Sequence, residues 1–385
     1  MNPIFAELPT TIFEEMSALA RALDAVNLGQ GFPDDPGPED VRRKAADAVI
    51  SGWNQYPPMP GLPELRQAVA AHYKVHQGLE IDPMAEVMVT SGATEGIAGA
   101  LLALIAPGDE VVLFEPYYDA YLPLVRRAGG VPKFVKLAPP DWRFTKAQLA
   151  AAIGPKTRVV LFNNPLNPSA TVYGPAELRL IAEAIRDTNA IVVADEVWEH
   201  VIFDGRAHTS VLAIPELRAR SVKIGSAGKI FSLTGWKVGF TVAAPDILKV
   251  LMKAHQFLTF TTPPNLQSAV AYGLGKDAAH FDAMRADLTA RRDHLAKGLA
   301  SAGFKTLACE GTYFINVDLA PLGLTDDQAF CRRLVKEAGV AAIPVSAFYA
   351  DGGMRSAIRF CFAKKYETLD AAVERLARYA PKLAA

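Results

Sequence analysis

The segment Ser91–Glu95 (SGATE) could bind a phosphate group. It follows a short apolar run, Val87–Thr90, and precedes a helical stretch, Glu95–Ala106. A turn of small residues between a strand and a helix leaves backbone N–H groups free, with the positive end of the helix dipole behind them. The candidate phosphate ligands are therefore Gly92, Ala93 and Thr94. The alternative is that Thr94 is only a helix N-cap, because such turns are common.

The pair Asp195-Glu196 ends another apolar run, Ile191–Ala194. A carboxylate at the carboxyl end of a buried parallel strand lies where open α/β sheets bind their ligands. Burial of its charge is costly unless a partner compensates it, and a pyridinium nitrogen would be such a partner for Asp195. A helix-capping Asp195 beside a solvated Glu196 is the alternative.

Lys229 stands in a glycine-containing turn after a strand-like run, in Ser226–Lys229 (SAGK), and the segment Gly235–Gly239 (GWKVG) follows. Lysine usually prefers the solvated surface. A buried amine close to a second cation loses its proton more readily, which is what a lysine nucleophile needs. Lys237 could be that cation and could also contact a phosphate, together with Ser226. The alternative for Lys229 is an ordinary surface lysine.

Arg359 lies inside the apolar run Ile358–Phe362 (IRFCF). A buried guanidinium needs an anion, and its planar fork suits a carboxylate that accepts two hydrogen bonds. Arg359 is therefore a candidate for binding the carboxylate of a substrate. An internal salt bridge is the alternative.

The elements around these residues alternate between strands and helices from about residue 87. Six short runs are nearly continuous in apolar character, as in strands that are covered on both faces: Val87–Thr90, Glu110–Phe114, Thr157–Phe162, Ile191–Ala194, Ser221–Ile224 and Gly239–Val242. Helical stretches such as Glu95–Ala106 and Ala176–Thr188 lie between them. The alternation predicts an α/β fold with a large domain whose mainly parallel sheet is flanked by helices.

The pattern changes near residue 275, where we expect a smaller α+β domain to begin. A long charged helix is predicted over Ala278–Ala302, followed by strands around residues 304–317, 340–345 and 357–362 and by helices over 326–338 and 367–379. The amphipathic stretch Thr10–Leu23 is expected to pack against this domain. The predicted organisation is an N-terminal arm over residues 1–40, a large domain over 41–275 and a small domain over 276–385.

Composition and charge exclude several classes of protein. The formal net charge of -1 provides no overall field toward nucleic acid or an anionic membrane. Three cysteines without a C-x-x-C pair support neither a disulfide framework nor a zinc site, so we expect no metal. The N-terminus lacks the pattern of a signal peptide, and the longest apolar stretch, residues 97–106, is too short to span a membrane. A cytoplasmic protein is expected.

The order of these motifs resembles that of the class I and II aminotransferases, which are fold-type-I pyridoxal-phosphate enzymes. More narrowly, the chain is similar to the branch of methionine aminotransferases and kynurenine aminotransferases (glutamine transaminase K). The resemblance covers almost the whole chain, from Asn27–Asp34 (NLGQGFPD) to Cys361–Lys365 (CFAKK). Matching segments between them are Asn54–Tyr56, Glu115–Asp119, Asn164–Val172, Asp195–Val197, Thr234–Gly239, Glu310–Phe314 and Ile343–Ser346.

The resemblance implies a homodimeric enzyme that uses pyridoxal 5′-phosphate to exchange an amino group between an amino acid and a 2-oxo acid. Lys229 would carry the cofactor on its amine and move the reacting proton, and Asp195 would pair with the pyridine nitrogen. The other implied cofactor contacts are Tyr118 stacked on the ring, Asn167 at the ring hydroxyl oxygen, Gly92, Ala93, Thr94, Ser226 and Lys237 at the phosphate, and Tyr56 at the phosphate bound by the other subunit. Arg359 would bind the substrate α-carboxylate, with Asn167 and the Gly31 backbone beside it.

Two positions depart from the family pattern. Trp198 stands where the family usually has a tyrosine that donates to the ring hydroxyl oxygen, so an indole N–H of different geometry would have to replace it. Leu166 stands where close relatives often have histidine, at an expected wall near the cofactor. An apolar and aromatic substrate pocket is predicted from Phe32, Tyr56, Tyr118, Phe348 and Tyr349. Because we identify no second positive group for a distal carboxylate, methionine, aromatic amino acids, kynurenine and glutamine are favoured over aspartate.

Three other functions fit the pattern less well. A carbon–sulfur β-lyase would need the same Lys229 and Arg359 and would release pyruvate and ammonia without an added 2-oxo acid. A non-catalytic regulatory protein with this fold would carry a further DNA-binding domain, for which the aminotransferase pattern leaves no basic helix. A nicotinamide-dependent enzyme is disfavoured because Gly29-Gln30-Gly31 does not open a strand–helix unit.

Overall fold

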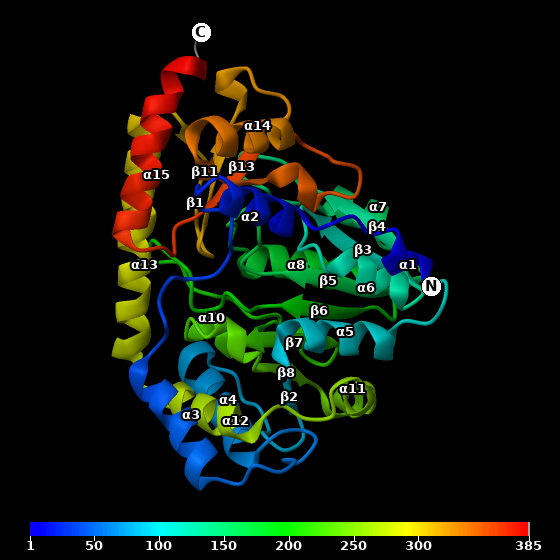
Figure 1. Cartoon of the computed structure of the whole chain (residues 1–385). Coiled ribbons are helices and arrows are strands. Elements are labelled where there is room, and N and C mark those ends of the chain that lie inside the picture. The colour runs from blue at the N-terminus through cyan, green and yellow to red at the C-terminus, as the bar shows by residue number, and fades with distance from the viewer. Residues whose placement is uncertain (384–385) are drawn as a thin grey trace.

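A computed structural model describes residues 1–383 of the chain. Its larger domain is built on a seven-stranded sheet (Figure 1). Six strands run in one direction, and β8 runs against both of its neighbours. The sheet is therefore mainly parallel, as predicted. The strands, in the order in which they lie side by side, are β2 (Val87–Thr90), β8 (Gly239–Ala243), β7 (Ser221–Ser226), β6 (Ile191–Asp195), β5 (Thr157–Asn163), β3 (Glu110–Glu115) and β4 (Val131–Lys136).

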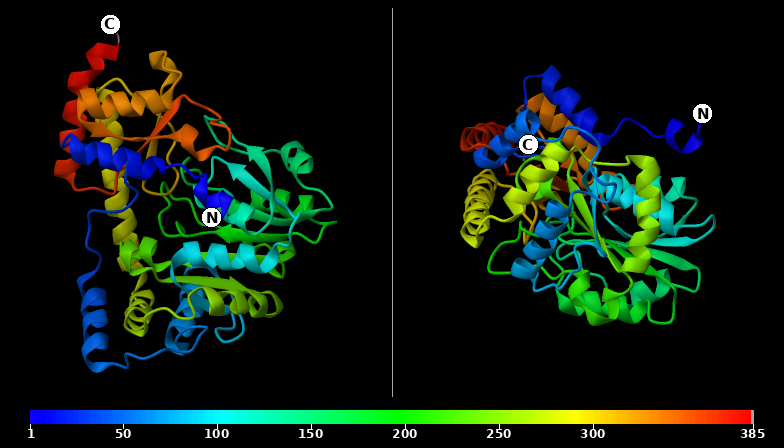
Figure 2. Two further views of the ribbon diagram at one scale, coloured as in Figure 1. Left: turned by 45° about the vertical axis from the view of Figure 1, so that its right-hand side comes forward. Right: turned by 90° about the horizontal axis from the view of Figure 1, so that it is seen from below.

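Helices cover both faces of this sheet (Figure 2). Successive strand residues point to opposite faces, so that Val112 and Phe114 belong to one core layer and Val111 and Leu113 to the other. The second layer is closed by α5 (Gly92–Leu104), α6 (Tyr121–Arg127) and α11 (Pro245–Leu258). The first is closed by α3 (Glu39–Ser51), α4 (Pro63–Gln77), α7 (Lys146–Ala152), α8 (Pro175–Ala184), α9 (Pro215–Arg218), α10 (Ala227–Ile230) and α12 (Pro264–Leu274). Cover on both faces explains the continuous apolar runs of the strands.

The smaller domain has an antiparallel sheet of four strands. In spatial order they are β12 (Ile343–Pro344), β13 (Ala357–Cys361), β10 (Phe314–Asp318) and β9 (Lys305–Thr306). Its helices are α2 (Ile12–Ala22), α14 (Asp327–Arg333), which continues as a π-helical turn over Leu334–Ala338, and α15 (Tyr366–Tyr379). Met16, Ala20 and Leu28 of the N-terminal segment are buried in the same core as Phe360. A further parallel pair, β1 (Val26–Asn27) with β11 (Val340–Ala341), joins that segment to the domain.

Two helices connect the domains. The long helix α13 (Ala278–Ser301) runs beside both of them (Figure 1). Phe281 in its first turns packs in the core of the large domain, whereas Leu295 and Leu299 pack in that of the small domain. At the other side, α1 (Pro3–Ala6) lies against α6 of the large domain. Within the described part of the chain, no helix has the length and apolar character that crossing a membrane requires.

Two buried histidines face each other between α4 and the loop after β6. The Nε2 atoms of His72 and His200 are 2.7 Å apart, and Nδ1 of His72 lies 3.1 Å from the carbonyl oxygen of Leu274. That carbonyl accepts a hydrogen bond from His72 Nδ1, so a neutral His72 accepts at Nε2 from His200. Burial lowers the pKa of His72 to about 4, an effect that Glu199 opposes and that His76 and Lys223 increase. Burial and the neighbouring His72 lower the pKa of His200 well below its ordinary value.

We predict that the protein loses stability as the pH decreases from 7 to 5. Each histidine takes up a proton near pH 6.5 in the unfolded chain and stays neutral in the folded protein, so the unfolded state binds more protons in this range. For His72 alone the loss is about 2 kcal/mol of unfolding free energy between pH 7 and 5. Urea unfolding at pH 7, 6 and 5 measures this loss of unfolding free energy. In His72→Gln the decrease should be smaller, and an unchanged pH dependence would contradict the assignment.

Candidate active site

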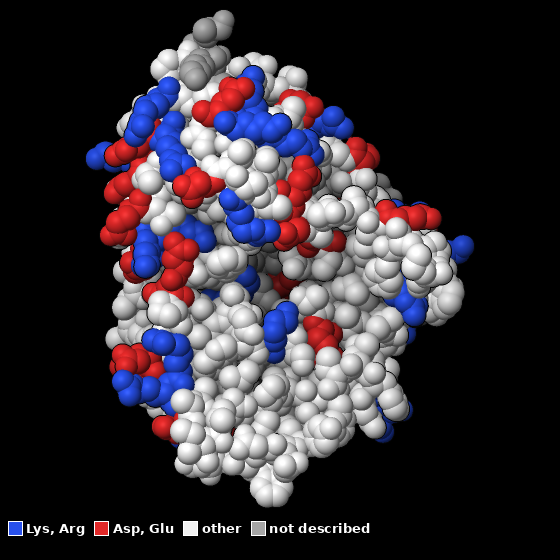
Figure 3. All heavy atoms as spheres, viewed as in Figure 1, with Lys and Arg blue, Asp and Glu red and all other residues white. Residues whose placement is uncertain are grey.

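A cavity of about 380 Å³ lies between the two domains, and it is seen as the hollow in the middle of the face in Figure 3. All the residues predicted to bind the cofactor or the substrate carboxylate, except Tyr56, line it: Gly31, Gly92, Ala93, Thr94, Tyr118, Asn167, Asp195, Trp198, Ser226, Lys229, Lys237 and Arg359. The large domain contributes the carboxyl ends of β5, β6 and β7 and the N-terminus of α5. This is the edge at which open α/β sheets bind ligands.

The N-terminus of α5 and Lys237 form a positively charged corner of the cavity. Lys237 has a left-handed backbone (φ 55°), and its Nζ lies 3.2 Å from the position that a Cβ on Gly92 would occupy. A Cβ on Gly239 would come within 2.7 Å of the carbonyl carbon of Gly92 and 2.8 Å of the nitrogen of Ala93. Strand β8 therefore approaches this turn as closely as a glycine allows. Free N–H groups, the helix dipole and an ammonium group meet here, and together they suit an anion such as phosphate.

Asp195 ends β6 as a buried carboxylate that lines the cavity. Its Oδ2 accepts a hydrogen bond of 2.6 Å from the hydroxyl of Tyr121, and its Oδ1 accepts one of 3.3 Å from the N–H of Val197. Burial raises the pKa of Asp195, although these hydrogen bonds and the charge of Lys229 oppose the rise. Among the described residues, no lysine, arginine or histidine forms an ion pair with Asp195. The carboxylate is thus available to a cationic group in the cavity.

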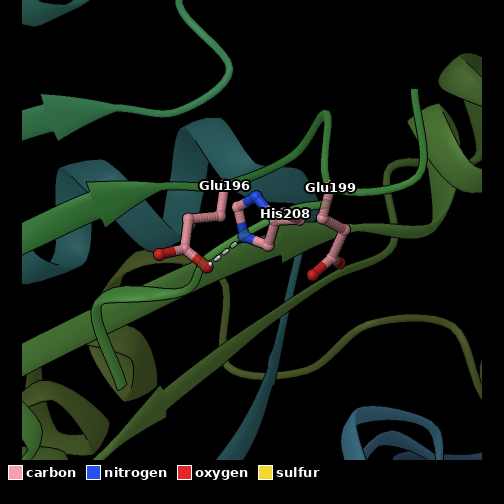
Figure 4. Close-up of side chains that lie close together, drawn as sticks. All are labelled: Glu196, Glu199 and His208. Atoms are coloured by element: carbon pink, nitrogen blue, oxygen red, sulfur yellow. Dashed lines mark hydrogen bonds and ion pairs between the residues drawn. The ribbon is translucent and has the colours of Figure 1, made fainter. Parts of the chain in front are cut away.

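The neighbouring Glu196 belongs to a buried ionic network and not to the solvent. Lys223 Nζ lies 2.6 Å from Glu196 and 2.7 Å from Glu199, and His208 Nε2 lies 2.9 Å from Glu196. Figure 4 shows Glu196, Glu199 and His208 close together, a set of residue types that can bind a metal ion. Here the ammonium group of Lys223 already contacts both carboxylates. Burial opposes ionisation of Glu196, but Lys223 and His208 lower its pKa to about 2. The alternative of a solvated Glu196 is wrong.

Lys229 lies in the short helix α10, with its amine inside the cavity. Nζ donates to the carbonyl oxygen of Gly31 over 3.3 Å and lies 4.6 Å from the centre of the Trp198 ring. Burial lowers the pKa of Lys229 to about 8; Cys361 and Asp195 oppose this shift, and Arg359 and Lys237 increase it. The alternative of an ordinary surface lysine is therefore wrong. An amine with this pKa can accept and release a proton near neutral pH.

Arg359 is buried on β13 with hydrogen-bonding capacity to spare. Nη1 donates to Oδ1 of Asn167 over 2.7 Å, and Nη2 donates to the carbonyl oxygen of Gly29 over 3.2 Å. Nε has no partner among the described residues, and the ring of Phe314 lies 3.8 Å from the guanidinium carbon. Burial lowers the pKa of Arg359 to about 10. No carboxylate of the described chain pairs with it, so the internal salt bridge is wrong and the guanidinium can bind an anion.

Some residues lie elsewhere than the sequence predicted. Tyr349 donates its hydroxyl to the carbonyl oxygen of Leu137, and Leu166 is buried in the core of the large domain, so neither lines the cavity. Phe348 lies behind Arg359 and is not a wall of the cavity. Tyr56 is 78% exposed on the outer surface, where its ring contacts that of Phe260.

Phe13 and Tyr121 are site residues that sequence reasoning missed. Phe13 projects from α2 into the cavity, 5.3 Å from the guanidinium carbon of Arg359. Tyr121 lies beneath the cavity and bonds to Asp195. An aromatic residue on an amphipathic helix is usually part of the core, so neither position carries a signal of its own. For Tyr121, its position three residues after Tyr118 was the only available indication.

Comparison with known proteins identifies the family. Residues 24–376 match the family model described as aminotransferase class I and II. The chain is 44% identical to the methionine aminotransferase of Escherichia coli over 96% of both proteins, and 35% identical to the kynurenine–oxoglutarate transaminase of Dictyostelium discoideum, with 95% of this chain and 93% of that protein covered. The solved structure of N-succinyldiaminopimelate aminotransferase from Mycobacterium tuberculosis superposes with a TM-score of 0.94 at 42% identity, covering 97% and 98% of the two chains. The chain belongs to the class I and II aminotransferase family, and its fold is the one that the resemblance implied.

We predict that Gly239→Ala weakens the binding of inorganic phosphate. The added methyl group would displace the Gly92–Ala93 backbone, and the loss of one hydrogen bond to a charged group corresponds to roughly tenfold or more in the dissociation constant. Calorimetric titration of the protein with inorganic phosphate measures the dissociation constant. Gly235→Ala is the control, because a Cβ there meets nothing within 4 Å. Equal losses in the two variants would contradict the close-approach argument.

Proposed function

We propose that this aminotransferase binds pyridoxal 5′-phosphate in the interdomain cavity and transfers the amino group of an amino acid with a neutral side chain, of the methionine or kynurenine type, to a 2-oxo acid. The observation that carries this proposal is the convergence of four groups in one cavity. They are the anion-binding corner at Gly92, the buried carboxylate of Asp195, the amine of Lys229 and the buried guanidinium of Arg359.

The residues present fit this cofactor. Gly92, Ala93, Thr94, Ser226 and Lys237 would hold the phosphate, and a side chain at Gly239 would push this corner out of place. Asp195 is a buried carboxylate without an ion-pair partner in the described chain, which suits a pyridinium nitrogen. Asn167 would contact the ring hydroxyl oxygen, and Tyr118 and Trp198 would lie against the ring. When bound, pyridoxal phosphate supplies an electron sink for the bond that breaks at the substrate Cα.

The chain's own residues orient the substrate and move its proton. Arg359 binds and orients the α-carboxylate, with Asn167 held beside it by their hydrogen bond. The amine of Lys229 is placed to take the proton from the substrate Cα, since it lies in the same cavity. Its pKa of about 8 lets it act as base and then as acid near neutral pH.

The cavity favours a substrate with an uncharged side chain. Its cations, within the described chain, are Lys229, Lys237 and Arg359, and each already has a role. The apolar lining is formed by Phe13, Phe32, Ile97, Val197, Trp198 and Phe314. A distal carboxylate would lose its hydration here without gaining a partner. Methionine, aromatic amino acids, kynurenine and glutamine therefore suit the cavity better than aspartate or N-succinyldiaminopimelate.

The working unit that we propose is a homodimer. Large apolar side chains are exposed on α3, on the loop after it and at the end of α11: Val49, Ile50, Trp53, Tyr56, Phe257, Leu258 and Phe260. Tyr56 and Phe260 touch, so the two segments are continuous. The lowest part of the face in Figure 3 also carries few charges. A second copy of the chain would cover this surface and bring Tyr56 to the phosphate of the other subunit.

The β-lyase alternative is not favoured, because the matched family and the named relatives are aminotransferases. The expected cytoplasmic location rests on the sequence alone.

The visible absorbance of the purified protein tests this function. The band of the lysine-bound cofactor should disappear when methionine is added without a 2-oxo acid and return when a 2-oxo acid is added. Lys229→Ala should lack the band and lose at least ~10²–10⁴-fold in rate, whereas Lys297→Ala, an exposed lysine on α13, should behave as the unmodified protein. Aspartate should react at least about tenfold more slowly than methionine, because its second carboxylate would be unpaired.

Two outcomes would overturn parts of this proposal. A band that persists while cystathionine yields pyruvate would indicate the lyase. Equal rates with aspartate and methionine would contradict the substrate assignment and leave the aminotransferase activity intact.

We also predict that Ile50→Asp and Phe257→Asp weaken the dimer. Their side chains are 83% and 85% exposed in one subunit, and a charge at either position would be buried against a second copy. Sedimentation velocity should show a dimer for the unmodified protein and a lighter species for the variants. Val131→Asp is the control, since Val131 is exposed on β4 at the opposite edge of the sheet. An unmodified protein that is monomeric and fully active would refute the homodimer.

A further inference from the structure

Tyr121, the first residue of α6, is buried beneath the cavity and touches the catalytic carboxylate. Its hydroxyl donates to Oδ2 of Asp195 over 2.6 Å. We propose that Tyr121 is a positioning residue that holds Asp195 as an oriented carboxylate and thereby strengthens its pairing with the ring nitrogen of the cofactor. The proposal rests on the cofactor assignment made above.

Few contacts fix the orientation of the Asp195 side chain. Its main-chain carbonyl accepts from Nδ2 of Asn163 over 2.8 Å and from the N–H of Asn164 over 3.0 Å, so the backbone is held. The carboxylate itself receives the short bond from Tyr121 on one oxygen and the longer bond from Val197 on the other. The hydroxyl of Tyr121 is thus the side-chain donor that fixes the carboxylate from the core side.

Tyr121 also connects Asp195 with the ring-facing residue Tyr118. The backbone N–H of Tyr121 donates to the carbonyl oxygen of Tyr118 over 3.0 Å, and their rings meet edge to face at 5.8 Å between centroids. Tyr121 is packed in the core layer between the sheet and α5, where it has little freedom to move. The residue expected at the face of the cofactor ring and the residue expected at its nitrogen are therefore held by one side chain.

The electrostatics support a donor role for this hydroxyl. Burial and the nearby Asp195 raise the pKa of Tyr121 well above its ordinary value, so the phenol keeps its proton. Burial also raises the pKa of Asp195, and the hydrogen bond from Tyr121 is the largest effect that opposes this rise. Without the hydroxyl, Asp195 would take up a proton at higher pH, and a neutral carboxyl group would pair poorly with a cationic nitrogen.

A purely structural role is the competing explanation, because any buried phenol needs an acceptor. Tyr173 provides the matched case in this chain. It is fully buried, and its hydroxyl donates to the carbonyl oxygen of Trp142 over 2.7 Å. Tyr173→Phe removes a hydroxyl from the core without touching a charged group of the cavity. It therefore measures the effect on ligand binding of losing a buried hydroxyl alone.

The test compares two ligands of the cofactor-free protein: pyridoxal 5′-phosphate and its analogue with carbon in place of the ring nitrogen. Tyr121→Phe should weaken the binding of pyridoxal phosphate about tenfold or more and leave the binding of the analogue nearly unchanged. Tyr173→Phe should change neither dissociation constant. Equal effects of Tyr121→Phe on both ligands, or no effect on either, would overturn the proposal. An unmodified protein that binds neither ligand would instead refute the cofactor assignment.

A second variant keeps the proposal testable if Tyr121→Phe does not fold. Replacement of Tyr121 by 3-fluorotyrosine keeps the ring and the hydroxyl but makes the phenol a stronger donor. Loss of pyridoxal phosphate binding on acidification should then occur at lower pH than in the unmodified protein. If fluorination does not shift the pH at which binding is lost, the proposed role of this hydrogen bond is contradicted.

Discussion

The cost of burying charge governs the arrangement of this enzyme. Asp195 and Arg359 are nearly inaccessible to solvent, and neither has an ion-pair partner of opposite charge in the described chain. Such groups are held by neutral donors and acceptors instead: Tyr121 for the carboxylate, and Asn167 with a backbone carbonyl for the guanidinium. Both charges therefore lack a counter-ion in the described chain, and ligands of opposite charge in the cavity can provide one.

The site is assembled from both domains and the N-terminal segment. Asp195 ends one strand of the large domain and Lys229 follows another, whereas Arg359 lies on a strand of the small domain. The segment around Gly29 and Gly31 joins them, because its carbonyl oxygens accept from Arg359 and from Lys229. A side chain at Gly31 would come within 2.9 Å of the Phe314 ring, so only glycine lets the segment pass between the domains without displacing that ring.

The sequence was sufficient for most of the fold and for the charged groups of the site, because periodicity and strand ends follow local rules. The direction of β8 was not predictable, since the apolar run over residues 239–242 is the same for a parallel or an antiparallel strand. The partners of Glu196 were also missed, because Lys223 reads as one polar residue in an apolar strand until the fold places it between two glutamates. Tyr121 and Phe13 depend on tertiary packing in the same way.

The charges of the cavity also limit what it can accept. The described residues that line it include three cations, Lys229, Lys237 and Arg359, and one anion, Asp195. With the proposed ligands bound, a phosphate with about −1.5 to −2 charges and one substrate carboxylate would be the anions that pair with these cations. A second carboxylate on the substrate would find no unassigned cation among the described residues of the cavity and would have to be buried among the rings of Phe13 and Phe314. The proposed preference for a neutral side chain therefore follows from the number of cations in the cavity and does not require a dedicated specificity residue.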